Sequence, residues 1–296
     1  MDWPTIRHWL LPWTDSDDVW VSVVFWLGLF SIGGLELLVP VHRNSRREQR
    51  WPANFGLGLI NLTLLSLLPA SSVLAAVWAK SHGVGLLNWL RVPWIEATFV
   101  TIAIRSFSSY AIHVVLHHVD FLWRIHRVHH FDMEVDVSTG LRTHPFEYAL
   151  AFFLGLTLAV AFGLSPWAVL CYDLADSLFA FLSHANIRVP ALLDRLLRLL
   201  MVTPALHALH HSSWRPETDS NFGTVLTLWD RIFRTYRDPQ VDRGGDLQFG
   251  LSDVRDERTA DLWWQLKSPL VKFAPAQSAA PEHEITDTLR TPVAVE

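Results

Sequence analysis

Four long stretches of apolar residues constrain the fold of this chain more than any other feature. They lie at about residues 19–39, 55–78, 94–116 and 148–182, and the first two contain no lysine or arginine. A helix of about 20 residues crosses the hydrocarbon core of a bilayer, which is about 30 Å thick. The fourth stretch is too long for one helix, and "GLSPW" at residues 163–167 divides it, because glycine and proline interrupt helices. The sequence therefore predicts an all-α, polytopic membrane helix bundle.

The composition agrees with a membrane protein and excludes one class of partner. Only 18% of the 296 residues are charged, whereas soluble proteins average about 25%. The chain has 15 tryptophans, a residue type that gathers at bilayer interfaces. The formal net charge is −5 and no basic stripe is present, so we expect no nucleic-acid partner.

The arginines between the apolar stretches predict which side of the membrane each loop faces. The loop after the first stretch is rich in arginine, whereas the loop after the second carries only Lys80 and Arg91. The arginines of the first loop are Arg43, Arg46, Arg47 and Arg50. Because cytoplasmic loops carry the excess of basic residues, we place the first loop in the cytoplasm. The end of the third stretch and both ends of the hairpin then face the same side.

Histidines recur at helical spacing on this predicted cytoplasmic face. "HVVLH" holds His113 and His117, and "HRVHH" holds His126, His129 and His130. The same spacing returns in "HALHH", and single histidines stand at the two ends of the hairpin. These further candidates are His207, His210, His211, His144 and His184. Random placement of 15 histidines predicts about 0.04 occurrences of H-x-x-H-H in such a chain, and two are present.

The spacing of these histidines predicts a site for two metal ions. Residues three and four apart share one face of a helix, and neutral imidazole is the commonest metal ligand. One triad can give two ligands to one ion and the third to a neighbouring ion. The spacing does not name the metal, because imidazole suits zinc, copper, iron and nickel.

Other polar residues in apolar surroundings complete the list of candidates. Asp173 and Asp176 lie inside the fourth apolar stretch, where a carboxylate is costly. We predict that both accept N–H bonds from ligand histidines; the alternative is a partnership with Arg105. Asp132, Glu134 and Asp136 are predicted to be solvated, and Cys171, the single cysteine, is predicted to be a small buried residue. No catalytic group beyond the metal ligands is predicted.

The order of the three histidine arrays resembles that of the fatty acid hydroxylase superfamily, within it the sterol-desaturase-like branch. "RVHHFDMEVDVSTGLRTHPFE", "LSHANIRVP" and "ETDSNFGTVLTLWDRIF" strengthen the resemblance, which covers residues 106–236. Arg234 departs from the glycine expected after the last motif. We divide the chain accordingly into an N-terminal interfacial segment with the first transmembrane helices (1–105), a catalytic region (106–236), a cytosolic C-terminal segment (237–274) and a disordered tail (275–296).

The resemblance implies an integral-membrane enzyme with two iron ions that uses O2 to hydroxylate or desaturate a lipid C–H bond. The lipid would enter from the bilayer. The chain has no haem motif, no dinucleotide-binding glycine motif and too few cysteines for an Fe–S cluster. The electrons would therefore come from an external reductase, ferredoxin or cytochrome.

Two other functions fit the histidine arrays. A non-redox dizinc hydrolase or lyase would need a base that activates the nucleophile, and no distinct one is visible. A metal transporter would hold polar ligands near the middle of the bilayer, whereas these arrays are predicted at one face.

Overall fold

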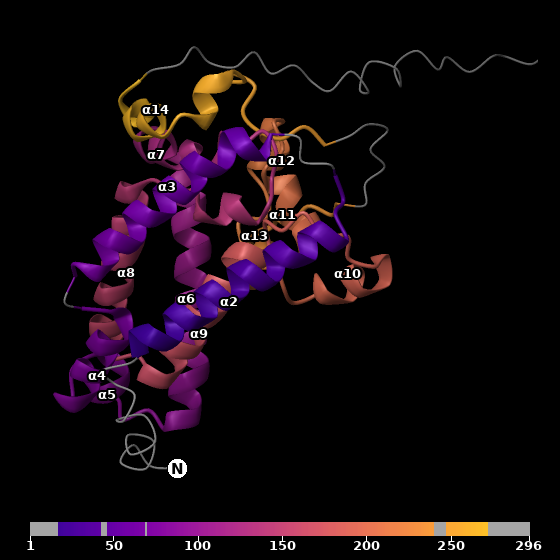
Figure 1. Cartoon of the computed structure of the whole chain (residues 1–296). Coiled ribbons are helices and arrows are strands. Elements are labelled where there is room, and N and C mark those ends of the chain that lie inside the picture. Colours follow the sequence, from indigo (N-terminus) through magenta and orange to yellow (C-terminus); the bar gives the residue numbers. More distant parts are fainter. Residues whose placement is uncertain (1–16, 43–45, 69, 240–246, 272–296) are drawn as a thin grey trace, which may run out of the picture.

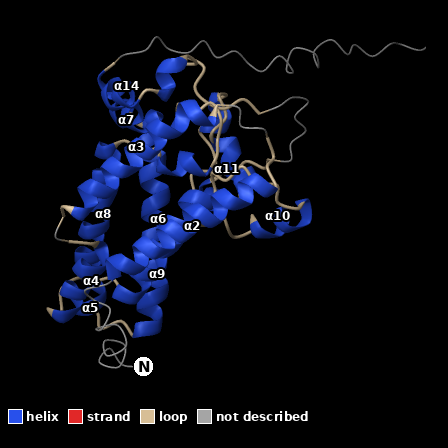
Figure 2. Cartoon of the chain, in the orientation of Figure 1, coloured by secondary structure: helices blue, strands red, loops and turns tan. Residues whose placement is uncertain are grey.

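The computed structural model describes residues 17–42, 46–68, 70–239 and 247–271. The predicted interfacial segment before residue 17 and the predicted disordered tail lie outside these residues. Figure 2 shows that the described elements are helices, and pairing of strands is limited to isolated β-bridges. This confirms the all-α prediction for the described part of the chain.

Two groups of helices make up the fold. The first comprises α2 (Asp17–Leu38), α3 (Arg47–Ser66), α4 (Ser72–Ser81), α5 (Leu86–Trp89), α6 (Trp94–His118), α8 (Pro145–Phe162) and α9 (Pro166–Leu182). The second comprises α7 (Asp120–His130), η1 (Val137–Leu141), α10 (Ala191–Leu197), α11 (Pro204–His210), α12 (Arg215–Thr218), α13 (Leu228–Phe233), η2 (Glu257–Ala260), α14 (Leu262–Lys267) and η3 (Ser268–Leu270). In Figure 1, α4 and α5 lie at one end of the long helices, and α7, α11, α12 and α14 lie at the other.

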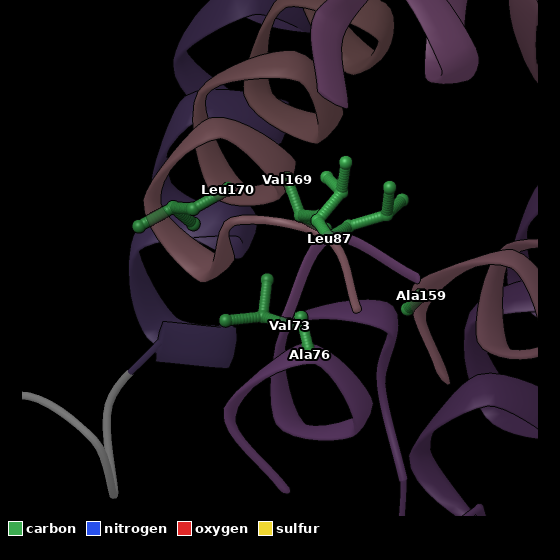
Figure 3. Packing of buried hydrophobic residues seen from close by; sticks show 7 residues of the cluster. Val73, Ala76, Leu87, Ala159, Val169 and Leu170 are labelled. Carbon is green, nitrogen blue, oxygen red and sulfur yellow. The ribbon is translucent and has the colours of Figure 1, made fainter. Parts of the chain in front are cut away.

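The long helices pack side by side through apolar side chains. Helix α2 contacts α9, and α4 contacts both α8 and α9. Figure 3 shows one cluster between them, in which Val73 and Ala76 of α4 meet Ala159 of α8 and Val169 of α9. Burial of such side chains stabilises each by about 1.5–3 kcal/mol for valine-sized groups.

Helices α6 and α8 are long and apolar enough to cross a membrane, by length and composition. Only 28% of the apolar window of α6 and 11% of that of α8 is buried. Phe99 of α6 and Phe153 of α8 are among the exposed side chains, so much of the apolar surface of both helices faces outward.

The prediction of one continuous helix over residues 55–78 is wrong. Helix α3 ends at Ser66 and α4 begins at Ser72, where the side chain of Ser71 accepts a hydrogen bond from the Leu74 N–H. This is an N-cap, which satisfies a backbone donor at the start of a helix and so favours a new helix there. At about 1.5 Å per residue, the ten residues of α4 are too short to span a bilayer core.

The division of the fourth apolar stretch into two helices is confirmed. Helix α8 ends at Gly163, whose φ is 62°, and Pro166 opens α9. A Cβ at Gly163 would lie 2.5 Å from Nδ2 of Asn88, so only glycine fits this left-handed turn. Cys171 on α9 is exposed, which corrects its predicted burial.

A buried polar network ties α3 to the segment after α7. Arg50 donates at 2.6 Å to both Asp132 and Asp136, whose exposed fractions are 1% and 0%. These two aspartates are therefore not solvated, in contrast to the prediction, because Arg50 compensates their charge. Glu134 is partly buried and accepts a hydrogen bond from the Arg46 N–H. The network fixes the position of η1 beside the histidine-bearing end of α7.

Candidate metal centre

Nine buried histidines meet where α6, α7, α9 and α11 come together. They form two groups, and within each the potential ligand atoms lie within 4.8 Å of one another. Group 1 contains His113, His117, His126, His130 and His210. Group 2 contains His129, His184, His207 and His211.

Short helices and tight connections bring these side chains together. Val119, in extended conformation, is the only residue between α6 and α7, so α7 folds back beside the end of α6. Helix α11 begins after Thr203, which caps it, and has Pro204 in its first turn. Proline is favoured there because its missing N–H would have no helical partner.

Each H-x-x-H-H array divides its histidines between the two groups. His126 and His130, four residues apart on α7, belong to group 1, whereas His129 belongs to group 2. At the other array, His210 belongs to group 1, and His207 and His211 belong to group 2. The helical repeat of 3.6 residues explains the pattern, since residues four apart share a face and the intervening one points to a neighbouring face.

The Nε2 atoms of group 1 converge. Nε2 of His126 lies 3.1 Å from that of His113 and 3.2 Å from that of His130. Nε2 of His117 and of His210 is buried and has no hydrogen-bond partner among the described residues. Nitrogens about 2.0–2.1 Å from a common ion lie about 3 Å from one another, which matches these spacings.

Group 2 is centred on His184. Its Nε2 lies 3.0 Å from Nε2 of His129, 3.1 Å from that of His211 and 3.0 Å from that of His207. The group thus draws one ligand from α7, one from the end of α9 and two from α11 and its C-cap. These residues are far apart in sequence and converge only in the folded chain.

Acceptors on the outer side of several rings fix which nitrogen faces inward. Nδ1 of His113 lies 2.8 Å from the Phe222 carbonyl, and Nδ1 of His210 lies 2.8 Å from the Ser220 carbonyl. In group 2 the corresponding acceptors are the carbonyl oxygens of Arg142 for His129 and of Ala180 for His184. A proton held at Nδ1 leaves the lone pair of Nε2 free, and this tautomer binds metal.

In group 1, two carboxylates also serve as acceptors for the Nδ1–H of a histidine ring. Oε1 of Glu147 lies 2.8 Å from Nδ1 of His126, and Oδ1 of Asp219 lies 3.1 Å from Nδ1 of His117. Neither residue is predicted from the sequence. They lie within the motifs "THPFE" and "ETDS", but only the fold shows which histidines they face.

Burial keeps the histidines outside the long helices neutral. Desolvation, followed by the repulsion of neighbouring histidines, holds the pKa of His129, His130, His207 and His211 well below the usual value. Burial also lowers the pKa of His184 to about 4 and that of His210 to about 3. Neutral imidazole at neutral pH is the ligand form.

Three predicted site residues lie elsewhere. Asp173 accepts from Arg105 at 2.6 Å and Asp176 accepts from Thr224 at 2.9 Å, so their described partners are not ligand histidines. The partnership with Arg105 is the alternative that holds for Asp173. His144 caps α8 by accepting from the Phe146 N–H, and its Nε2 lies 3.2 Å from the Leu266 carbonyl, outside both groups.

Comparison with known proteins places the histidine-bearing region in a family. Residues 98–235 match the fatty acid hydroxylase family, and this range contains all nine histidines of both groups. The curated relatives agree with this match. Residues 98–235, just under half of the chain, therefore belong to the fatty acid hydroxylase superfamily.

The relatives are lipid enzymes by name. The chain is 29% identical over 164 residues to alkylglycerol monooxygenase of Caenorhabditis elegans, covering 52% of this chain and 30% of the relative. It is 31% identical over 134 residues to the human alkylglycerol monooxygenase, covering 44% and 28%. It is 28% identical over 155 residues to ornithine lipid hydroxylase OlsE of Rhizobium tropici, covering 52% and 46%.

The matched region spans less than half the length of each of these relatives. No solved structure gives a significant match to this chain.

Proposed function

We propose that this protein is a membrane-bound diiron oxygenase that hydroxylates a lipid C–H bond with O2 and external electrons. The observation that carries the proposal is the convergence of nine buried, inward-facing imidazoles in two adjacent groups. The names of the relatives, alkylglycerol monooxygenase and ornithine lipid hydroxylase, support a lipid substrate and favour hydroxylation over desaturation.

The residues present fit two metal ions. The Nε2 atoms of His117 and His210 are buried and have no hydrogen-bond partner among the described residues, as expected of atoms that would bind a metal ion. Group 1 would hold one ion and group 2 the other. Bound iron would supply the redox chemistry with oxygen that side chains lack, and an all-imidazole donor set suits it.

The surrounding chain has two tasks. The carbonyl and carboxylate acceptors orient the rings, as described above. Apolar rings exclude water: Trp123 lies 4.9 Å from His117 between ring centroids, and Phe222 lies 5.0 Å from the same ring. A dry site protects reactive species from side reactions.

The outer surface of the fold supports a location in the membrane. The proposed cytoplasmic side of the metal centre rests on the arginines of the loop after the first apolar stretch. Helices α6 and α8 expose apolar side chains, as noted above. The region of α10 adds exposed leucines, among them Leu192 at 68% and Leu200 at 72%. Such a surface lies stably at a bilayer interface. An apolar substrate reaches a site beside it without crossing water.

The electron donor is proposed to be a separate protein of reductase, ferredoxin or cytochrome type. One cysteine cannot ligate an Fe–S cluster, and the sequence shows no motif for a nucleotide or haem cofactor.

Comparative lipidomics tests the function. Cells expressing the protein are compared with cells expressing His129→Ala, which removes a group 2 ligand, and with His82→Ala, which changes an exposed histidine outside both groups. We expect one lipid class to gain an oxygen atom with the wild type and with His82→Ala only. Loss of two hydrogens instead would establish desaturation. A product that does not depend on O2 would contradict the proposal.

A further inference from the structure

The two groups of histidines differ in what lies behind their rings. In group 1, two of the five Nδ1 atoms face carboxylates and two more face carbonyl oxygens. The fifth, on His130, is buried and has no hydrogen-bond partner among the described residues. In group 2, two of the four Nδ1 atoms face carbonyl oxygens. The other two, on His207 and His211, are buried and have no hydrogen-bond partner in the described chain.

Glu147 brings a negative charge to group 1. Its Oε1 lies 2.8 Å from Nδ1 of His126, and its Oε2 is buried without a hydrogen-bond partner. Among the described residues, the ion pairs of Glu147 include no arginine or lysine; its partner is His126. The charge of this carboxylate is therefore directed at the imidazole and at whatever cation that imidazole binds.

Asp219 brings a second carboxylate, which is partly neutralised. Its Oδ1 faces His117 at 3.1 Å, whereas its Oδ2 accepts from Arg215 at 2.6 Å. Arg215 also donates to the His117 carbonyl and lies over the Trp123 ring at 4.4 Å. Asp219 is thus held firmly in place, but Arg215 neutralises part of its charge.

A carboxylate behind a ligand imidazole raises the basicity of the metal-facing nitrogen and fixes the ring, and loss of such a partner costs about 10- to 100-fold in metal affinity. Negative charge near a cation also stabilises it by direct attraction, more so in a buried site. No carboxylate stands directly behind a group 2 ring: Asp132 and Asp136 act on His184 only through space and are paired with Arg50. Group 2 also has one imidazole fewer. We infer that group 1 binds its metal ion more tightly than group 2 and that Glu147 is the main positioning residue responsible. This inference rests on the proposed function only for the existence of the metal centre.

Release of iron to a competing chelator tests the inference. The purified full-length protein is loaded with Fe²⁺ without oxygen, freed of excess metal and mixed with a coloured ferrous chelator. We expect two phases of equal amplitude in the wild type, a fast release from group 2 and a slow release from group 1. His207→Ala removes the fast phase, because it disrupts group 2. Glu147→Gln accelerates the slow phase by about 10- to 100-fold and leaves the fast phase unchanged.

Two further variants make the test specific. Glu96→Gln makes the same chemical change at an exposed position near the start of α6, and we expect wild-type release. Asp219→Asn accelerates the slow phase by a smaller factor than Glu147→Gln, since Arg215 already offsets part of its charge. It also serves as the test if Glu147→Gln does not fold, as judged by thermal unfolding.

The outcomes separate this inference from the proposed function. A chain that binds no metal would overturn the metal centre itself. A chain that binds two ions and releases both at one rate would overturn only the difference between the groups. A folded Glu147→Gln protein with an unchanged slow phase would also overturn the role of Glu147.

Discussion

The main-chain carbonyl of Arg142 lies 3.1 Å from Nδ1 of His129, while the guanidinium of the same residue is fully buried. That guanidinium donates to the Val128 carbonyl, to Oδ1 of Asn54 and to the Thr259 carbonyl. One residue thus joins α3, α7 and the C-terminal segment, and holds a group 2 histidine in register.

Arg142→Lys should therefore destabilise the protein by about 1–3 kcal/mol, because one ammonium cannot reach the three acceptors of a planar guanidinium. The measurement is the midpoint of chemical unfolding in detergent. Arg258→Lys, at an exposed site on η2, provides the matched control and should have wild-type stability. Equal stability of the two variants would contradict this role of Arg142.

Asp230→Asn should loosen the loop that faces group 1. The carboxylate of Asp230 accepts from the N–H groups of Phe222 and Gly223, each at 2.8 Å, and from Thr235 at 2.7 Å. An amide places an NH2 group against one of these donors, which costs about 1–3 kcal/mol for a buried unsatisfied group. Because the Phe222 carbonyl contacts His113, metal retention by group 1 should fall as well. Unfolding and metal content are measured together, and wild-type values for both would refute the prediction.

Gly223→Ala should be poorly tolerated. A Cβ at this position would lie 2.4 Å from the Leu226 carbonyl and 2.8 Å from Oδ2 of Asp230, and overpacking of this kind costs about 1–3 kcal/mol. Gly34→Ala is the control, since a Cβ there meets nothing within 4 Å and alanine favours a helix by about 0.5–1 kcal/mol. The thermal midpoint should fall for the first variant and stay level or rise for the second.

Acid should destabilise the metal-free protein. The buried histidines have a pKa below the value of about 6.5 that they have when unfolded, so the unfolded chain binds more protons. Their contribution to stability is present above pH 6.5 and is lost as the pH falls toward their lowered values. Thermal unfolding of the metal-free chain from pH 7.5 to pH 5 measures this. His211→Asn should flatten the pH dependence, whereas His82→Asn, at an exposed site, should leave it unchanged; a flat wild-type profile would exclude the effect.

The region of α10 should contact lipid. Leu196 is 55% exposed, and a cysteine in its place, in a Cys171→Ser background, can carry an environment-sensitive fluorophore. In reconstituted vesicles, lipids with a nitroxide near the headgroup should quench this probe strongly. The same probe at Arg258→Cys, far from α10 in sequence, should show weak quenching. Equal quenching at both positions would argue against an interfacial α10.

The sequence predicts those parts of the structure that depend on local chemistry. Gly163 and Pro166 mark the turn of the hairpin because both act on their own backbone. The spacing of His126, His129 and His130 indicates their shared helix for the same reason.

Contacts between distant segments were beyond such reasoning. Asp132 and Asp136 look like surface residues until Arg50, more than eighty residues earlier, is placed between them. For Asp173 the sequence leaves two partners open, a ligand histidine and Arg105, and only the fold shows that the partner is Arg105. Glu147 and Asp219 cannot be predicted in the same way, because no regular sequence spacing links a carboxylate to the histidine that it contacts in the fold. The break between α3 and α4 depends on a single serine cap within an uncharged stretch.

Each H-x-x-H-H array, on α7 and on α11, contributes histidines to both groups, so a change in either helix affects both groups. A single residue inserted or deleted in α7 before His126 would turn His126, His129 and His130 together by about 100° around the helix axis. A change of length in either short helix would therefore disturb both histidine groups at once, whereas a substitution on the exposed face of α6 or α8 would leave both groups in place.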